Sequence, residues 1–188
     1  QTALNLDIAG AFDNQSGKVI AQTGAVDISA TSIDNRGGTL ASLKGALQAK
    51  ALGGWLRNDF DLNNNRQAGI IQAQSLVLTS ANLNNNGGRI AAQAGDVVAT
   101  TGAFDNRDGG LYAKGMVKVI GSSFDNSGNV RGQVAGANID LNLSGALNNQ
   151  KGIIESDTTL KVSAAALDNQ YGQLRALGSS GKTEFQIG

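Results

Sequence analysis

The chain of 188 residues has no cysteine, no proline and no histidine, and only 4% of its residues are aromatic. The lack of cysteine excludes a disulfide framework, so the fold must be held by packing and hydrogen bonds alone. The scarcity of large aromatic anchors argues against an ordinary globular core of this size. With no histidine, no cysteine and no serine–base constellation, nucleophilic catalysis has few side chains to use.

The chain also has no excess of charge of either sign and no long apolar run. Its 15 basic and 15 acidic residues give a formal net charge of zero. Nucleic-acid-binding domains carry a basic stripe, so a nucleic-acid partner is not expected. No run approaches the roughly 18 apolar residues that mark a membrane-spanning helix, so insertion into a membrane is not expected either.

One short phrase recurs eight times along the chain: an apolar residue, Asp or Asn, an invariant Asn, a polar stretch, Gly, and then an aliphatic residue. Successive central asparagines are 21, 29, 21, 21, 20, 23 and 20 residues apart. A repeat of this length is typical of a solenoid. The central asparagines are Asn14, Asn35, Asn64, Asn85, Asn106, Asn126, Asn149 and Asn169.

Restricted columns around each phrase predict short strands with one buried face. Two residues after the glycine of each phrase stands a branched aliphatic residue, and two residues further on stands a small one. The aliphatic column is Val19, Leu40, Ile71, Ile90, Leu111, Val130, Ile154 and Leu174. A second alternating strand precedes most of the phrases, as at Val26 and Ile28 or at Leu76 and Leu78.

Strands this short, joined by corners too short for a helix, predict an all-β fold: a parallel β-helix with about 20–21 residues per coil. Coils would stack about 4.8 Å apart, and parallel crossovers favour the right-handed form. Residues 1–188 are therefore expected to form a single domain. Because both ends of the sequence fall inside strand patterns, we expect this rod to be part of a longer one.

The asparagine column is expected to hold the register of the coils. A buried Asn amide both donates and accepts, so stacked copies can form a ladder of hydrogen bonds. The Asp or Asn that precedes each rung is expected to accept from N–H groups at the corner. Carboxylates stacked one per coil do not converge on a point as a calcium site requires, so no metal and no other cofactor is predicted.

The longest spacing points to an insertion of about eight residues near positions 53–60, which contains the only tryptophan. Insertions in solenoids emerge at one corner and are common places for binding loops. Trp55, Arg57 and Phe60 are therefore candidate partner-binding residues. The alternative is that Trp55 and Phe60 fold back and pack on the flank of one coil.

Carbohydrate-active enzymes also use β-helices, so an enzyme of that class is the rival from another functional class. Such enzymes need carboxylates clustered on one face. The acidic residues outside the repeat column do not recur at matching registers in adjacent coils, apart from a loose match at Glu155 and Asp157. No catalytic residue is predicted, and the chain is not expected to be an enzyme.

The phrase Leu/Phe/Ile-Asp/Asn-Asn-x-x-Gly-x-Ile/Leu/Val, followed by Ala and a Leu-x-Leu strand, resembles the repeats of the filamentous haemagglutinin family along essentially the whole chain. The family comprises large exoproteins of two-partner secretion in Gram-negative bacteria, including adhesins and the stalks of contact-dependent growth-inhibition toxins. The resemblance implies a secreted or cell-surface shaft, exported by an outer-membrane transporter partner. We expect a structural, adhesive segment; the alternative is a receptor-binding segment of a toxin stalk, with a cell-surface receptor or glycan as its partner.

Overall fold

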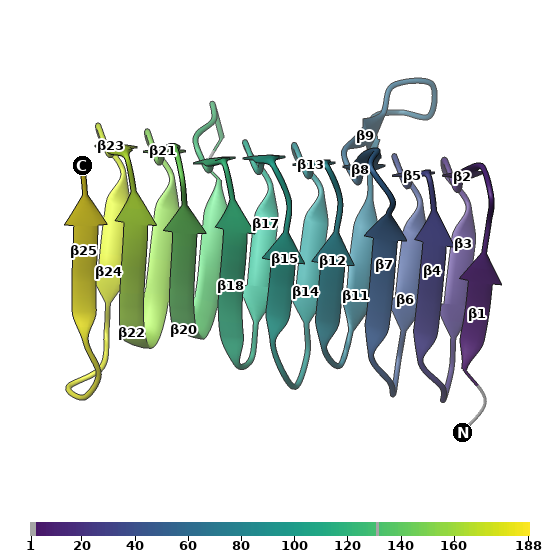
Figure 1. Ribbon diagram of the computed structural model, residues 1–188, viewed down its shortest axis with the longest axis horizontal. Helices are drawn as coiled ribbons and strands as arrows, with labels where there is room; N and C mark the ends of the chain where they lie inside the picture. Colours follow the sequence, from purple (N-terminus) through teal and green to yellow (C-terminus); the bar gives the residue numbers. More distant parts are fainter. Residues whose placement is uncertain (1–2, 131) are drawn as a thin grey trace.

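The computed structural model describes residues 3–130 and 132–188, and within these ranges the chain forms β-strands and no helix. The strands wind into one continuous solenoid. In Figure 1 the chain rises along the front strands, crosses over the top, descends behind and advances from right to left, which is a right-handed coil. All strand pairs between coils are parallel, as the repeat predicts.

Each coil contributes a front strand, a short top strand and a rear strand. The front strands are β1 (Leu4–Asp7), β4 (Val26–Ala30), β7 (Leu47–Ala51), β12 (Leu76–Thr79), β15 (Val97–Thr100), β18 (Met116–Gly121) and β25 (Thr183–Ile187). The top strands are β2 (Ala11–Asp13), β5 (Ser32–Asp34), β8 (Trp55–Arg57), β13 (Asn82–Asn84), β16 (Ala103–Asp105), β19 (Ser123–Asp125), β21 (Ala146–Asn148) and β23 (Ala166–Asp168).

The rear strands complete each coil. They are β3 (Lys18–Ala21), β6 (Thr39–Ser42), β11 (Ile70–Ala73), β14 (Arg89–Ala92), β17 (Gly110–Ala113) and β24 (Gln173–Ala176). Two long strands, β20 (Gln133–Leu143) and β22 (Ile153–Ala164), each run through a rear position and on into the next front position. Front and rear strands therefore belong to one 15-stranded sheet, and the top strands form a separate eight-stranded sheet.

In-register pairing puts equivalent side chains of successive coils in line inside the solenoid. On the front strands, Val26 pairs with Leu47 and Leu47 with Leu76, and all three are at most 1% exposed. On the top strands, the rings of Phe104 and Phe124 lie 4.8 Å apart between centroids. Burial of each such aliphatic side chain contributes roughly 1.5–3 kcal/mol before entropy is counted, so these columns are the main source of stability.

The asparagine ladder is present, with one rung that differs from the sequence prediction. The Nδ2 of each asparagine donates to the Oδ1 of the next at 2.7–2.8 Å. The third rung is Asn58; Asn64 lies outside the ladder, where it donates to the Ser16 hydroxyl. The rungs are Asn14, Asn35, Asn58, Asn85, Asn106, Asn126, Asn149 and Asn169.

This shift of rung also moves the insertion. Trp55 to Arg57, placed in an insertion by the repeat alignment, form the regular top strand β8, which pairs in register with β13. Asn58 bonds to the carbonyl of Gly69, 11 residues on, whereas Asn14 bonds to that of Gly17, 3 residues on. The eight extra residues (11 − 3) therefore lie between Asn58 and Gly69 and not at 53–60.

A second register shift occurs after the sixth rung. The alignment of the repeats places Val130 in the buried aliphatic column, but Val130 is 84% exposed. Val134 takes that place: it pairs with Leu111 and is 1% exposed. The corner glycine is Gly132, which lies against the Asn126 carbonyl, so three further residues are inserted between rung and glycine here.

Candidate functional site

The insertion in the third coil folds as a small hairpin on one corner of the solenoid. Its strands, β9 (Phe60–Asp61) and β10 (Gln67–Ala68), pair antiparallel. The tip, residues 62–66, is exposed, and Leu62 shows 72% of its surface. Asn65 and Arg66 both have positive φ, which lets the chain reverse there. Figure 1 shows the hairpin standing out from the top of the coils.

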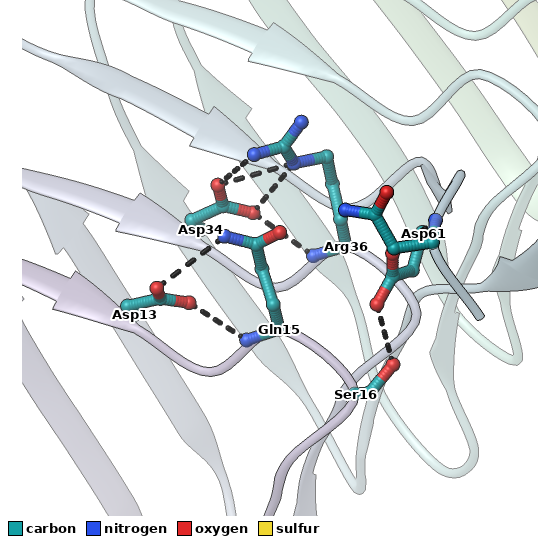
Figure 2. A network of polar contacts seen from close by, with 7 residues as sticks. Asp13, Gln15, Ser16, Asp34, Arg36 and Asp61 are labelled. Atoms are coloured by element: carbon teal, nitrogen blue, oxygen red, sulfur yellow. Dashed lines mark hydrogen bonds and ion pairs between the residues drawn. The ribbon is translucent and has the colours of Figure 1, made fainter.

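Polar contacts tie the hairpin to the two preceding coils. The Ser16 hydroxyl of the first coil donates to Asp61 Oδ2 at 2.6 Å, and Asn64 Nδ2 donates to that hydroxyl at 3.0 Å. The Gln67 side-chain amide donates to the Gly37 carbonyl of the second coil. Figure 2 shows Ser16 and Asp61 facing each other beside the Asp34–Arg36 pair. Side-chain hydrogen bonds therefore attach the hairpin to the first and second coils.

On its other side the hairpin packs against the fourth coil. The Phe60 ring lies over Gly87, where a Cβ would come within 2.1 Å of the ring. The Arg66 guanidinium stacks on the same ring, with Cζ 5.0 Å from the centroid. Together with the polar contacts, this packing fixes the hairpin across four successive coils.

The identity of the residue two positions after a ladder asparagine, at the corner of each coil, determines whether the hairpin has room to pack there. Ser16, Asp108, Lys151 and Tyr171 occupy this corner with φ between 52° and 59°, so a non-glycine residue is accepted there. In the two coils that flank the hairpin, glycine stands at this corner with nearly the same φ, 63° at Gly37 and 66° at Gly87. Gly128, two positions after Asn126, differs: its φ is 149°, and it lies in the longer connection that leads to Gly132. A Cβ on Gly37 would lie 2.6 Å from Asp61 Cβ. These two glycines thus make room for the hairpin.

Trp55 and Arg57 stand beside the hairpin on the outer surface of the top sheet, where both break the pattern of their columns. The column of Trp55 otherwise holds Ala, Ser or Asn, and that of Arg57 otherwise holds Asp or Asn. Trp55 is 42% exposed, with the Arg57 Cζ 5.6 Å from its ring. The pair borders a hollow of about 330 Å³ lined also by Ser32, Ile33, Asp34 and Gly54.

Two carboxyl groups at the base of the hairpin, those of Asp59 and Asp61, have pKa values shifted in opposite directions. Hydrogen bonds from the Ser16 hydroxyl and from the Asn63 N–H lower the pKa of Asp61. Burial raises the pKa of Asp59, whose buried Oδ1 has no hydrogen-bond partner among the described residues. The pKa of Arg36 is raised, chiefly by the hydrogen bond that the Arg36 side chain donates to Asp34. At the base of the hairpin, the charged form of Asp61 is thus stabilised, whereas the charged form of Asp59, two residues away, is destabilised by burial.

The sequence predictions for this region hold in part. The Asp/Asn column does cap the corners: Asp13, Asp34 and Asp125 accept the N–H groups two residues on. Trp55, Arg57 and Phe60 come together near one corner, but only Phe60 belongs to the hairpin. The anchors Ser16, Gly37 and Gly87 were not predicted, although glycine at the corner of the Asn85-Asn86-Gly87-Gly88 stretch was a visible signal.

The profile of the haemagglutinin repeat matches three overlapping stretches, residues 2–54, 45–151 and 123–183, which together span nearly the whole chain. The chain belongs to the haemagglutinin-repeat family. No curated protein and no solved structure matches it with significance. The family suggests a structural, adhesin-like segment of a two-partner-secretion exoprotein, secreted or at the cell surface, and is typically structural rather than enzymatic.

Residues 3–130 and 132–188 include no group of three acidic side chains placed to hold a metal ion. The same residues contain no helix with the length and apolar character needed to cross a membrane.

Proposed function

We propose that this chain is a rigid shaft segment of a Gram-negative exoprotein, exported by an outer-membrane two-partner-secretion transporter, which displays other parts of the protein at or beyond the cell surface. The unbroken ladder from Asn14 to Asn169 carries this proposal. Each rung ties two coils, so bending the rod means breaking buried amide bonds. Eight coils at about 4.8 Å give a length of roughly 40 Å.

We further propose that the segment contacts a target-cell receptor through Trp55, Arg57 and the hairpin. A half-exposed indole on a face of small side chains can insert into a partner surface, and Trp and Arg are the residues that most often dominate such contacts. The hairpin beside them is held by four coils. Because it is fixed before binding, little ordering entropy is lost on association.

Binding of the labelled chain to target cells tests this function. Trp55→Ala and replacement of residues 59–68 by Asn-Gly, which recreates the regular Asn-Asn-Gly-Gly corner of the fourth coil, should each reduce binding at least tenfold. Tyr171→Ala is the matched control, because Tyr171 is an exposed aromatic at a corner far along the rod. Equal binding by all variants, with unchanged circular dichroism, would exclude Trp55 and the hairpin as the contact.

Small-angle scattering tests the shaft separately. A rod of roughly 40 Å or more for the wild type and for the hairpin replacement supports a shaft that does not depend on the hairpin. A compact globule would contradict the proposal whatever the binding result.

A further inference from the structure

Arg57 stands at a position where the other seven coils make a corner hydrogen bond. In those coils the Asp or Asn that ends the top strand accepts the N–H two residues on at 2.9–3.1 Å, as Asp34 and Asn84 do in the adjacent coils. A guanidinium has no acceptor, so Arg57 cannot make this bond. A residue that breaks a structural rule of its own repeat is expected to serve a function.

Trp55 is a second departure from the repeat, two residues before Arg57. It stands between Ser32 and Asn82 of the adjacent coils, and it is 42% exposed. Leu56, which separates Trp55 from Arg57, is buried, so the side chains of Trp55 and Arg57 both point outward. The guanidinium lies over the indole, with Cζ 5.6 Å from the ring centroid. The two departures therefore form one pair on the outer surface.

The hollow of about 330 Å³ beside this pair has one cation without an ion pair. Asp34, which also lines the hollow, is bound by Arg36 at 2.6 Å. Within residues 3–130 and 132–188, Arg57 forms no ion pair. Gly54 packs so closely on the second coil that a Cβ would come within 2.9 Å of Ser32 Cβ. The lining beside the indole is thus tightly packed, and its unpaired charge is positive.

The strand that carries both residues has no free edge. β8 pairs with β5 on one side and with β13 on the other. A peptide therefore cannot add here as a further strand through main-chain hydrogen bonds. A ligand is left with one flat indole, the N–H donors of one guanidinium, and the polar side chains of Ser32 and Asn82.

We propose that Trp55, Arg57 and Ser32 form a binding site for an acidic sugar, a pyranose ring that carries a carboxylate. This inference rests on the proposed receptor contact and names the chemical class of its ligand. The C–H face of the ring packs on the indole, and the planar carboxylate accepts two parallel N–H bonds from Arg57. A neutral sugar would leave the guanidinium desolvated without a partner, so the site selects by charge.

The single tryptophan of the chain reports on this site directly, because no other indole contributes to its fluorescence. Methyl glucuronide should bind about tenfold more tightly than methyl glucoside, which differs from it only in lacking the carboxylate. The methyl glycoside of N-acetylneuraminic acid, titrated in parallel, shows which acidic sugar fits better. Binding of both acids should weaken as salt is added. If neither acid binds more tightly than the glucoside, the proposal is wrong.

Two substitutions return the third coil to the residues of its columns. Arg57→Asn restores an acceptor at the corner, and Trp55→Ala restores a small side chain, so neither should lower the urea midpoint. In saturation-transfer NMR, each should weaken the binding of methyl glucuronide by about tenfold or more. Arg89→Asn, which removes another arginine stacked on an aromatic ring, should leave binding unchanged. A lower midpoint for Arg57→Asn would show that Arg57 serves the fold and would overturn the assignment.

Binding to target cells separates this inference from the proposed function. If Trp55→Ala binds cells as well as the wild type does, the receptor contact at Trp55 is itself wrong. If Trp55→Ala loses cell binding but an excess of neither acidic sugar displaces the wild type, the contact stands and the acidic sugar is wrong. Tighter binding of a poly-glutamate peptide than of either sugar would assign Arg57 to a protein partner and would also overturn the inference.

Discussion

The Phe60 ring of the third coil occupies the space that a Cβ on Gly87 of the fourth coil would need, at a distance of 2.1 Å. The absence of a side chain at Gly87 therefore leaves the space in which the Phe60 ring of the hairpin packs. The corner conformation by itself does not require glycine, since Lys151 adopts the same one with φ 59°. Contact with Phe60 is what distinguishes this corner from the others.

We expect Gly87→Ala to destabilise the third and fourth coils by about 2 kcal/mol or more. About 1 kcal/mol comes from placing a Cβ at positive φ, and the remainder from displacing Phe60. The free energy of unfolding from urea titration measures the loss. Lys151→Ala, at a corner of the same conformation, should change it by less than about 0.5 kcal/mol.

The double variant Phe60→Ala/Gly87→Ala separates the two causes. If the ring is the obstacle, the double variant should be more stable than the sum of the single effects predicts, by about 1 kcal/mol. Strict additivity would mean that the two residues do not interact and would contradict the packing described above.

Asn58 and Asn64 give a direct test of which residue is the third rung. Asn58→Ala removes an acceptor from Asn35 and a donor from Asn85, both buried, at a cost of about 1–3 kcal/mol for each group left unpaired. Asn64→Ala loses only an exposed bond to Ser16 and should cost less than about 0.5 kcal/mol. Urea midpoints of the two variants, compared with the wild type, decide between them. A larger loss for Asn64→Ala would contradict the observed ladder.

The repeat predicts the class of fold, the parallel stacking and seven of the eight rungs, because these depend on columns that recur in every coil. The third rung is missed because Arg57 stands before Asn58, where every other coil has Asp or Asn. Leu62-Asn63-Asn64 imitates the phrase only six residues later. Asn58 is buried and Asn64 is exposed. Burial depends on how the coils stack, so a short motif does not reveal which of the two asparagines is the rung.

The second misplaced register has a similar cause. Gly128 and Val130 reproduce the spacing of a regular corner, so the phrase looks complete before its true end. The regular repeat resumes at Gly132 and Val134, whereas Asn129 and Val130 are exposed. The residues that anchor the hairpin, Ser16 and Gly37, could not be predicted either. They belong to the first and second coils, and the sequence of those coils does not indicate that an insertion in the third coil reaches them.

The corrected register predicts opposite results for two valines four residues apart. Val134→Ala empties part of the core column between Leu111 and Ile154 and should cost about 2 kcal/mol, from lost burial and the cavity left behind. Val130→Ala changes an exposed side chain and should leave the free energy of unfolding within about 0.5 kcal/mol of the wild type. Thermal and urea unfolding of both variants measure this difference. Equal losses would mean that both valines are buried.

Asp59 and Asp61 should respond to pH in opposite directions. The pKa of Asp61 is lowered, above all by the Ser16 hydroxyl, so its contribution to stability is present above the ordinary aspartate value of about 3.9 and is lost as the pH falls through its folded-state pKa. The pKa of Asp59 is raised by burial, so stability is lost as the pH rises through that raised value.

We therefore expect Asp61→Asn to lower stability at neutral pH and to have little effect well below the ordinary aspartate pKa. Asp59→Asn should raise stability at neutral pH, because it removes a buried charge whose Oδ1 has no hydrogen-bond partner in the described part of the chain. This gain should shrink on acidification. Hydrogen exchange of the Gly37 and Gly69 amides, which both donate to the Asp59 carbonyl, reports on this corner directly. If both substitutions shift protection the same way at neutral pH, the two carboxyl groups do not have the opposite environments described here. Ser16→Ala provides the link to the cause, since it should remove most of the pH dependence assigned to Asp61 and leave that of Asp59 in place.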